Sequence, residues 1–359
     1  MIKKLDWYII QKFLTTFFFA IMILVVISCV IDYSEKVDNI VQKKATFMEV
    51  LNYYKNFIPH ITALLFHLFI FIATIFFTSK MAYKSEIIAI LSSGVSFQRF
   101  LRPYLIGASF LCAISLTANH WIIPLANKQR VAFEDKYIND GNYAIPGENV
   151  HLAYAKDAYV YIRNFNFTTG KGNGFTAEKM KGTQLTEKMM ADDISYDSLK
   201  HTWHLHNVMV RRNDTLKETV TTIEDMYINY PFKPTDLNRN EALKEALTTP
   251  ELIEYIKTES LRGRENLNMF YVEKDRRTSQ PFAGLILTVI GACIASRKIR
   301  GGSGFHLALG ISISAIYVMF MQLSTTFSTK ASLNPTISVW IPNALFAIIA
   351  YSLYRRQVK

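Results

Sequence analysis

The sequence has little cysteine, and its long polar middle has none. The 359 residues include three cysteines, Cys29, Cys112 and Cys293, and each falls within a long apolar run. The polar block at residues 124–277, which separates these runs into two groups, contains no cysteine. Disulfides therefore cannot stabilise this block, and it has to fold on a hydrophobic core of its own.

Charge is absent from the apolar runs. Six runs contain no Asp, Glu, Lys or Arg, and each has about 19 residues or more, enough to cross about 30 Å of hydrocarbon. We therefore expect six membrane spans. Because proton-coupled carriers usually need carboxylates within the membrane, the missing acids argue against secondary transport. The runs are residues 13–31, 57–79, 103–123, 278–296, 304–329 and 334–354.

A nucleotide-binding loop is also absent from the sequence. Gly170-Lys-Gly-Asn-Gly-Phe is rich in glycine, but it lacks the Gly-Lys-Ser/Thr ending of a P-loop. A β-turn explains this segment better. If the protein performs work, the energy has to come from another subunit.

The excess of basic over acidic residues lies on one predicted side of the membrane. On that side the acids are Asp6 and Glu86, and the number of bases minus these two acids equals the formal net charge of the chain, +11. Because Lys and Arg in short loops stay cytoplasmic, we predict a multi-pass inner-membrane protein with both termini in the cytosol. These bases flank membrane helices, so we expect no nucleic-acid partner. They are Lys3, Lys4, Lys12, Lys80, Lys84, Arg99, Arg102, Arg297, Lys298, Arg300, Arg355, Arg356 and Lys359.

The polar block begins with strand patterns and ends with a helical one. Apolar and polar residues alternate over 159–167 and 202–210, with turn-forming residues between them. Short strands at this spacing predict a β-sandwich of the jelly-roll type that ends near residues 231–234. A helix is predicted to begin at Thr249, which is followed by proline and acids, and to be interrupted near Gly263.

The predicted fold class is an α+β membrane protein with three spans on each side of a periplasmic β-jelly-roll. Residues 1–124 contain the first three spans, and residues 125–235 form the jelly-roll. Residues 236–277 form a helical connector, and residues 278–359 contain the last three spans.

A short amphipathic helix is predicted at about residues 85–96, between the second and third spans. Ser85 is expected to cap its start, Glu86 favours the positive helix end, and Gly94 ends it. Ile87, Ile90 and Leu91 recur at the spacing of one helix face. Such a face could insert into a partner's groove, or the helix could lie flat on the lipid headgroups.

Two constellations in the polar block point weakly to catalysis. His204 and His206 share one strand face, but no third metal ligand stands out, so we expect no metal and no cofactor. Asp192, Asp193 and Asp197 could supply a carboxylate pair, although turn chemistry explains them better. A membrane-anchored glycan or lipid hydrolase therefore remains the alternative function. A membrane scaffold is a third possible function, but the six predicted spans argue against it.

Several stretches, in this order, resemble the lipopolysaccharide-export permeases of the LptF/LptG family. Together with the arrangement of spans around a β-insert, the resemblance covers essentially the whole chain. The stretches are Leu5-Asp-Trp-Tyr-Ile, Ser85-Glu-Ile-Ile-Ala-Ile-Leu-Ser-Ser-Gly-Val-Ser, Tyr159-Val-Tyr-Ile, Trp203-His-Leu, Leu267-Asn-Met-Phe and Gln280-Pro-Phe-Ala.

The resemblance implies a non-catalytic permease subunit of an ABC-type exporter that extracts lipopolysaccharide from the inner membrane. Its implied partners are a cytosolic LptB-like ATPase dimer, a second permease of the family, and LptC-like and LptA-like periplasmic β-jelly-roll proteins. The ATPase would bind the helix between the second and third spans, and Glu86 would face one of its bases. The matching residues here are Ser85, Glu86, Ile87, Ile90, Leu91 and Gly94.

The resemblance also implies that the first and fifth spans form a lateral gate for lipid. Phe17 and Phe18 in the first span and Tyr317 in the fifth are then candidate lipid contacts. Family members of the LptG type often carry a base at the outer end of the first span, where this chain has Asp32. The nearby candidates for contacts with lipid phosphates are Lys36, Lys43 and Lys44.

Overall fold

The computed structural model describes ten segments of the chain, which form two compact units. One unit contains Met1–Val131, Lys244–Leu252 and Asn268–Lys359, and the other contains Ala132–Leu243 and Ile253–Leu267. The described residues are 3–138, 150–166, 169–182, 184–197, 200–214, 217–237, 243–261, 267–298, 302–330 and 333–358.

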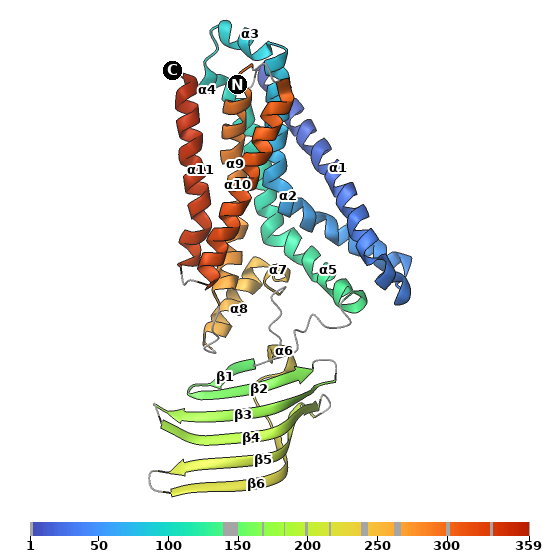
Figure 1. Cartoon of the computed structure of the whole chain (residues 1–359), viewed down its shortest axis with the longest axis vertical. Helices are drawn as coiled ribbons and strands as arrows, with labels where there is room; N and C mark the ends of the chain where they lie inside the picture. The colour runs from blue at the N-terminus through green and yellow to red at the C-terminus, as the bar shows by residue number, and fades with distance from the viewer. Residues whose placement is uncertain are drawn as a thin grey trace. The chain divides into compact units, whose positions relative to one another are not determined.

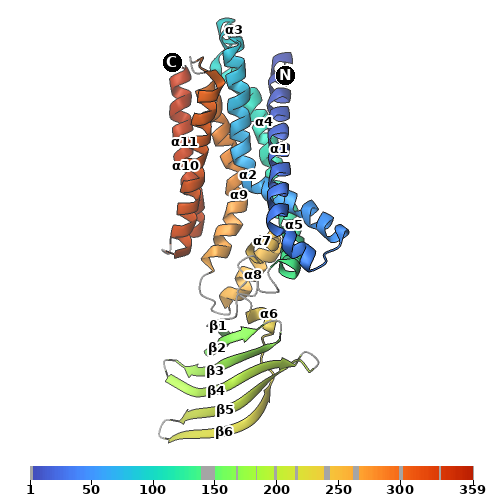
Figure 2. The same ribbon diagram turned by 45° about the vertical axis from the view of Figure 1, so that its right-hand side comes forward.

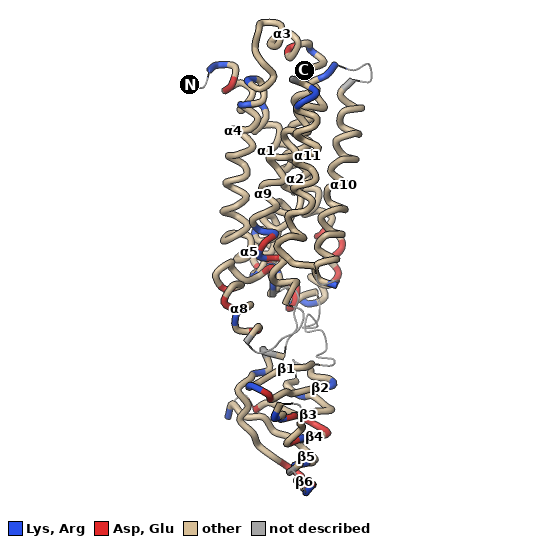
Figure 3. The backbone as a smooth tube through the Cα atoms, turned by 90° about the vertical axis from the view of Figure 1, so that its left-hand side faces the viewer, with Lys and Arg blue, Asp and Glu red and all other residues tan. Residues whose placement is uncertain are grey.

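The first unit is a helix bundle. Within the described residues, six helices are long and apolar enough to cross a membrane, which confirms the six predicted spans. Charged residues gather towards the two ends of the bundle, as Figure 3 shows. The helices are α1 (Lys4–Gln42), α2 (Phe47–Tyr83), α4 (Phe97–Thr117), α9 (Asn268–Ala295), α10 (Gly302–Lys330) and α11 (Pro335–Val358).

The end of the bundle that carries the short helix α3 (Glu86–Ser92) is also where α1 begins and α11 ends (Figure 1). We call it the α3 end. At the opposite end, a capping box starts α2: the Glu49 amide donates to Thr46 Oγ1, and the Thr46 amide donates to the Glu49 carboxylate. Both α1 and α2 have far more residues than a bilayer requires, so they extend beyond its hydrocarbon core.

Small residues allow the helices to approach closely. A Cβ atom on Gly107 of α4 would lie 2.9 Å from Phe13 Cδ1 of α1. A Cβ atom on Gly284 of α9 would lie 2.9 Å from Ile70 Cδ1 of α2. Figure 2 shows α1 at the edge of the bundle and α10 beside α11. Few α1 residues in its apolar part are buried inside the bundle, whereas most of those in α9 are buried.

The third long helix changes its winding near the opposite end. After α4 the chain forms a five-residue π-helix, η1 (Ala118–Ile122), and continues as α5 (Ile123–Tyr137). A π-turn is wider than an α-turn and often occurs at functional positions. The predicted span at 103–123 therefore ends within an irregular turn that its apolar composition did not indicate.

The described strands of the second unit form one antiparallel sheet in the order β1-β2-β3-β4-β5-β6. The strands predicted from alternation at 159–167 and 202–210 are confirmed as parts of β2 and β5, except that residue 167 lies outside the described residues. The jelly-roll is not confirmed, because it requires non-consecutive strands as neighbours. The strands are β1 (Val150–Ala155), β2 (Ala158–Asn166), β3 (Lys171–Lys181), β4 (Gln184–Asp197), β5 (Thr202–Asp214) and β6 (Lys217–Ile228).

One face of this sheet holds an apolar core that needs no disulfide. Trp203 of β5 is fully buried, and its indole Nε1 donates a hydrogen bond to the Phe232 carbonyl oxygen at 2.9 Å. The rings of Phe165 and Phe232 pack against it. The hydrogen bond satisfies the one polar group that burying a tryptophan would otherwise leave unpaired.

Three short helices follow the sheet in the chain. They are α6 (Pro234–Leu237), α7 (Leu243–Ala246) and α8 (Thr249–Leu261). The predicted start of a helix at Thr249 is confirmed, whereas the predicted interruption at Gly263 lies outside the described residues. The side chain of Glu251 accepts hydrogen bonds from the amide and the hydroxyl of Thr248, which caps α8.

Candidate coupling helix and lipid-contact surfaces

Helix α3 is shorter than predicted but ends as expected. Gly94 adopts φ +89°, and its amide donates to the Leu91 carbonyl oxygen at 3.1 Å, so glycine closes the helix. Ser85 occupies the N-cap position with a left-handed backbone, yet its side chain makes no capping bond. The Ser85 hydroxyl instead accepts from Lys298 Nζ at 3.0 Å, which joins α3 to the chain that follows α9.

The apolar face of α3 packs against the chain's own core. Ile87 is 1% exposed and belongs to the same apolar cluster as Met81 and Phe97. Ile90 and Leu91 are half-buried against that cluster. Of the large apolar side chains of α3, Ile88 is the one that projects outwards, at 51% exposed. The interpretation of Ile87, Ile90 and Leu91 as a free face is therefore corrected: a partner could reach Ile88.

The two candidate phenylalanines of α1 point in different directions. Phe17 is 2% exposed, with its ring edge-on to Phe66 of α2 at a centroid distance of 5.5 Å. Phe18 is 50% exposed and contributes to a shallow apolar groove of about 500 Å³ along α1. Other groove residues are Trp7, Leu14, Phe19 and Met22. Lipid could thus reach Phe18, whereas Phe17 packs between helices.

Tyr317, the candidate in α10, is buried among helices. Its hydroxyl donates to Asn343 Oδ1 of α11 at 2.8 Å, and its ring lies edge-on to Phe346. Asn343 in turn donates to the Ser279 carbonyl oxygen of α9 at 2.8 Å. These bonds connect three helices, so the structure gives Tyr317 contacts with protein rather than a lipid-facing position.

The three candidate lysines differ in what surrounds them. Lys36 Nζ lies 2.6 Å from Asp32 Oδ1 and 2.5 Å from the Tyr53 hydroxyl, while Tyr54 donates to Asp32 Oδ2 at 3.2 Å. The positive charge of Lys36 is therefore already matched by the carboxylate of Asp32. Lys43 and Lys44 lie in the turn between α1 and α2, where Lys44 is exposed and has a positive φ of 53°.

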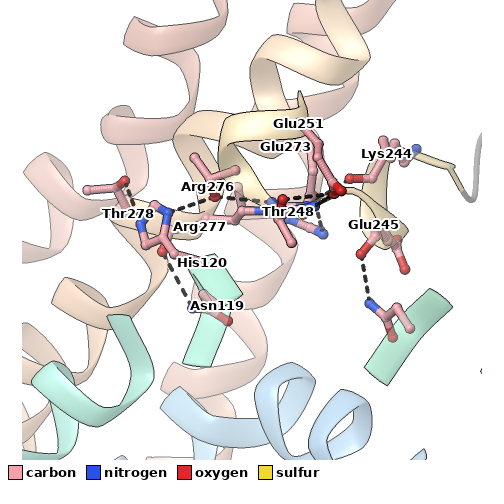
Figure 4. A network of polar contacts seen from close by, with 12 residues as sticks. Asn119, His120, Lys244, Glu245, Thr248, Glu251, Glu273, Arg276, Arg277 and Thr278 are labelled. Carbon is pink, nitrogen blue, oxygen red and sulfur yellow. Dashed lines mark hydrogen bonds and ion pairs between the residues drawn. The ribbon is translucent and has the colours of Figure 1, made fainter. Parts of the chain in front are cut away.

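A buried polar network, which the sequence did not reveal, occupies the opposite end of the bundle (Figure 4). Arg277 of α9 is 4% exposed, and its guanidinium lies 3.1 Å from Glu273 Oε1, one helical turn earlier. It also donates to Thr249 Oγ1 at 3.2 Å and to the Lys244 carbonyl oxygen at 2.8 Å. These two hydrogen bonds from Arg277 attach the segment around Thr249 to α9.

The π-helix η1 supplies two further members of this network. Asn119 donates to the Arg277 carbonyl oxygen at 3.4 Å, and His120 Nδ1 lies 2.8 Å from Thr249 Oγ1. In the sequence, the available signal was the Glu273/Arg277 spacing of four residues next to an apolar run. The π-turn that brings Asn119 and His120 to it has no comparable sequence signal.

The candidate catalytic residues of the sheet form exposed pairs. Asp225 Oδ1 lies 2.8 Å from His204 Nε2 and 3.0 Å from His206 Nδ1, and Asn207 donates to Asp192. The hydrogen bond to Asp225 raises the pKa of His206 above its ordinary value. No group of three or more possible metal ligands occurs in the described segments.

A comparison with protein-family models decides between these interpretations. The family model described as "Lipopolysaccharide export system permease LptF/LptG" matches residues 7–356. The chain belongs to the LptF/LptG family. A comparison with curated proteins found no match. Because the family match covers nearly the whole chain, it includes the helix bundle, α3 and the sheet together, and it confirms the resemblance drawn from the sequence. LptF/LptG proteins are permeases, in agreement with a transport role.

Proposed function

We propose that the chain is the transmembrane permease subunit of an ABC-type exporter that moves lipopolysaccharide out of the inner membrane. The observation that supports this most strongly is the family match over residues 7–356. In this proposal, ATP is hydrolysed by a separate LptB-like dimer. A second permease completes the membrane part, and LptC-like and LptA-like proteins receive the lipid in the periplasm.

The proposed orientation places the α3 end in the cytosol and the sheet in the periplasm. The excess of basic residues flanking the helices at the α3 end supports it. Residues 1–124 and 278–359 then form the two groups of three spans, residues 125–235 the periplasmic β-domain, and residues 236–277 its connector.

Helix α3 is the proposed docking site for the ATPase. Glu86 is at its first turn and half-buried, and Ile88 is its exposed apolar side chain. Replacing Glu86→Arg reverses a charge that would face a base of the ATPase, so recovery of the ATPase with the tagged permease should fall. Unchanged recovery from membranes that contain normal amounts of the variant would refute this role for Glu86.

The proposed lipid path follows the apolar groove on α1. Phe18 is exposed there, and Lys43 and Lys44 lie in the turn beyond the end of α1. Acyl chains would contact the groove, while lipid phosphates would meet Lys43 and Lys44.

The deciding experiment is affinity purification from native membranes through a tag on Lys359, followed by mass spectrometry of proteins and lipids. Recovery of a soluble ATPase, a second six-span permease and a lipid A-containing glycolipid would support the exporter. Recovery of the chain without an ATPase or a glycolipid would refute it.

A further inference from the structure

An ion pair at the α3 end joins α1 to the helix that follows α3. A guanidinium nitrogen of Arg99 in α4 lies 2.6 Å from Asp6 Oδ2 in α1. The same carboxylate oxygen accepts the backbone amide of Lys3 at 2.7 Å, which caps the start of α1. Asp6 is 4% exposed. One buried carboxylate thus both starts α1 and fastens it to α4.

Arg99 lies close to α3 in the chain and is flanked by residues that pack with it. It is in the first turn of α4, where its amide donates to Ser96 Oγ at 3.3 Å, and only a short turn separates this point from Gly94. Phe97 and Phe100, on either side of Arg99, share one apolar cluster with Ile87 of α3. A displacement of α3 would therefore carry the first turn of α4 with it.

The contact between α1 and α4 continues beyond the ion pair. The Phe13 ring of α1 packs on Tyr104 at a centroid distance of 6.0 Å and against Gly107, where a Cβ atom would not fit. On its other side, α1 exposes the groove that contains Phe18 and Met22. The helix fastened to α4 by Asp6 is thus the helix that offers an apolar surface.

We propose that Asp6 and Arg99 are a positioning pair that transmits displacement of α3 to α1 and so couples events at α3 to the lipid-accessible surface of α1. The assignment rests on the proposed exporter function. It gives a role to Asp6, one of the two acids among the basic residues of that side. Removing Arg99 leaves the buried carboxylate of Asp6 without its guanidinium partner, so the coupling is sensitive to the loss of Arg99 alone.

The test uses the complete exporter, with the partner permease and the ATPase, reconstituted in liposomes. Arg99→Gln removes the pair, Arg99→Lys keeps a positive charge, and Arg102→Gln is the matched control at an exposed arginine of the same helix. Three quantities are measured: ATP hydrolysis, lipopolysaccharide release, and the ATP-dependent spectral change of a spin label at Met22→Cys.

We expect Arg99→Gln to hydrolyse ATP within about twofold of the unmodified complex but to lose about fivefold or more of its lipid release. The spin-label response should fall with release. Arg99→Lys should retain most of both, and Arg102→Gln should match the unmodified complex. A pair that only stabilised the fold would lower protein yield and ATP hydrolysis together with release.

Normal release and spin-label response in Arg99→Gln would overturn the assignment, as would an equal loss in Arg99→Lys, which keeps the charge. Failure of the unmodified complex to release lipid on ATP addition would instead refute the proposed function and, with it, this assignment. The two failures are therefore distinguishable.

Discussion

Single residues with similar sequence surroundings have different roles in this chain. Phe17 and Phe18 are neighbours in an apolar run, yet one packs against α2 and the other is exposed. A helix that is apolar all round gives no pattern from which to choose between them. Lys36 is a similar case. Its pairing with Asp32, one helical turn away, could have been predicted from the sequence spacing, but its contact with Tyr53 of α2 could not.

The most consequential residue that sequence reasoning missed is Arg277. Replacing Arg277→Gln removes one of the guanidinium groups paired with the buried carboxylate of Glu273, which keeps Arg276, and breaks the bonds to Thr249 and Lys244. We expect a loss of about 1–3 kcal/mol in the free energy of unfolding, seen as a lower melting temperature of the detergent-purified protein.

The control for this prediction is Arg297→Gln, which removes the same charge at an exposed position. It should change the free energy of unfolding by about 0.5 kcal/mol or less. Equal melting temperatures for the two variants would show that the buried network contributes no more than a surface charge.

His206 provides a prediction about pH. Because the bond to Asp225 raises its pKa in the folded state, the protonated pair stabilises the sheet below the ordinary histidine pKa of 6.5. That contribution is lost as the pH rises through the raised pKa. NMR titration of the ring protons should give a midpoint above 6.5, and Asp225→Asn should lower it. A midpoint unaffected by Asp225→Asn would contradict this cause.

At the scale of elements, the sequence predicted where α3 and the strands lie but not what they face. Glycine and periodicity located α3 to within a few residues, and alternation located β2 and β5. The direction of the apolar face of α3, towards Met81 and Phe97, depends on contacts with other helices. The sheet order likewise depends on which strands pair, and local alternation does not encode that.

The faces of α3 make a prediction that separates packing from docking. Ile88→Glu changes an exposed side chain, so the permease should keep its stability but lose about tenfold or more of the ATPase recovered with it. Ile87→Ala should instead cost about 2–4 kcal/mol of stability, because Ile87 is buried.

Ile88→Leu serves as the control and should retain the ATPase, since it preserves an apolar side chain of the same size. Thermal unfolding and affinity purification of each variant measure the two effects. Recovery of the ATPase with Ile88→Glu at the normal level would place the docking surface elsewhere.

At the scale of the whole molecule, the number of spans was the most predictable feature. Charge-free runs of sufficient length located all six long helices, because hydrocarbon requires this composition whatever the helices pack against. The polar networks that hold the helices together, such as Tyr317 with Asn343, were not predictable, since each joins residues far apart in the chain.

The proposed orientation can be checked by labelling single cysteines in a variant in which Cys29, Cys112 and Cys293 are replaced. Gln98→Cys is exposed in the first turn of α4 and should react with a membrane-impermeant maleimide only after the inner membrane is disrupted. Leu333→Cys, exposed before α11, should react in intact spheroplasts. The reverse pattern would invert the topology.

The π-helix η1 also limits how this chain can change in length. Its wider turn holds one residue more than a regular α-helix would, so α5 is rotated by about 100° relative to an uninterrupted continuation of α4. Deleting a single residue there would preserve apolar composition and span length, yet it would turn His120 or Asn119 away from Thr249 and Arg277. An insertion or deletion in this turn therefore changes the helical register of α5 relative to α4. A hydropathy profile does not detect that change.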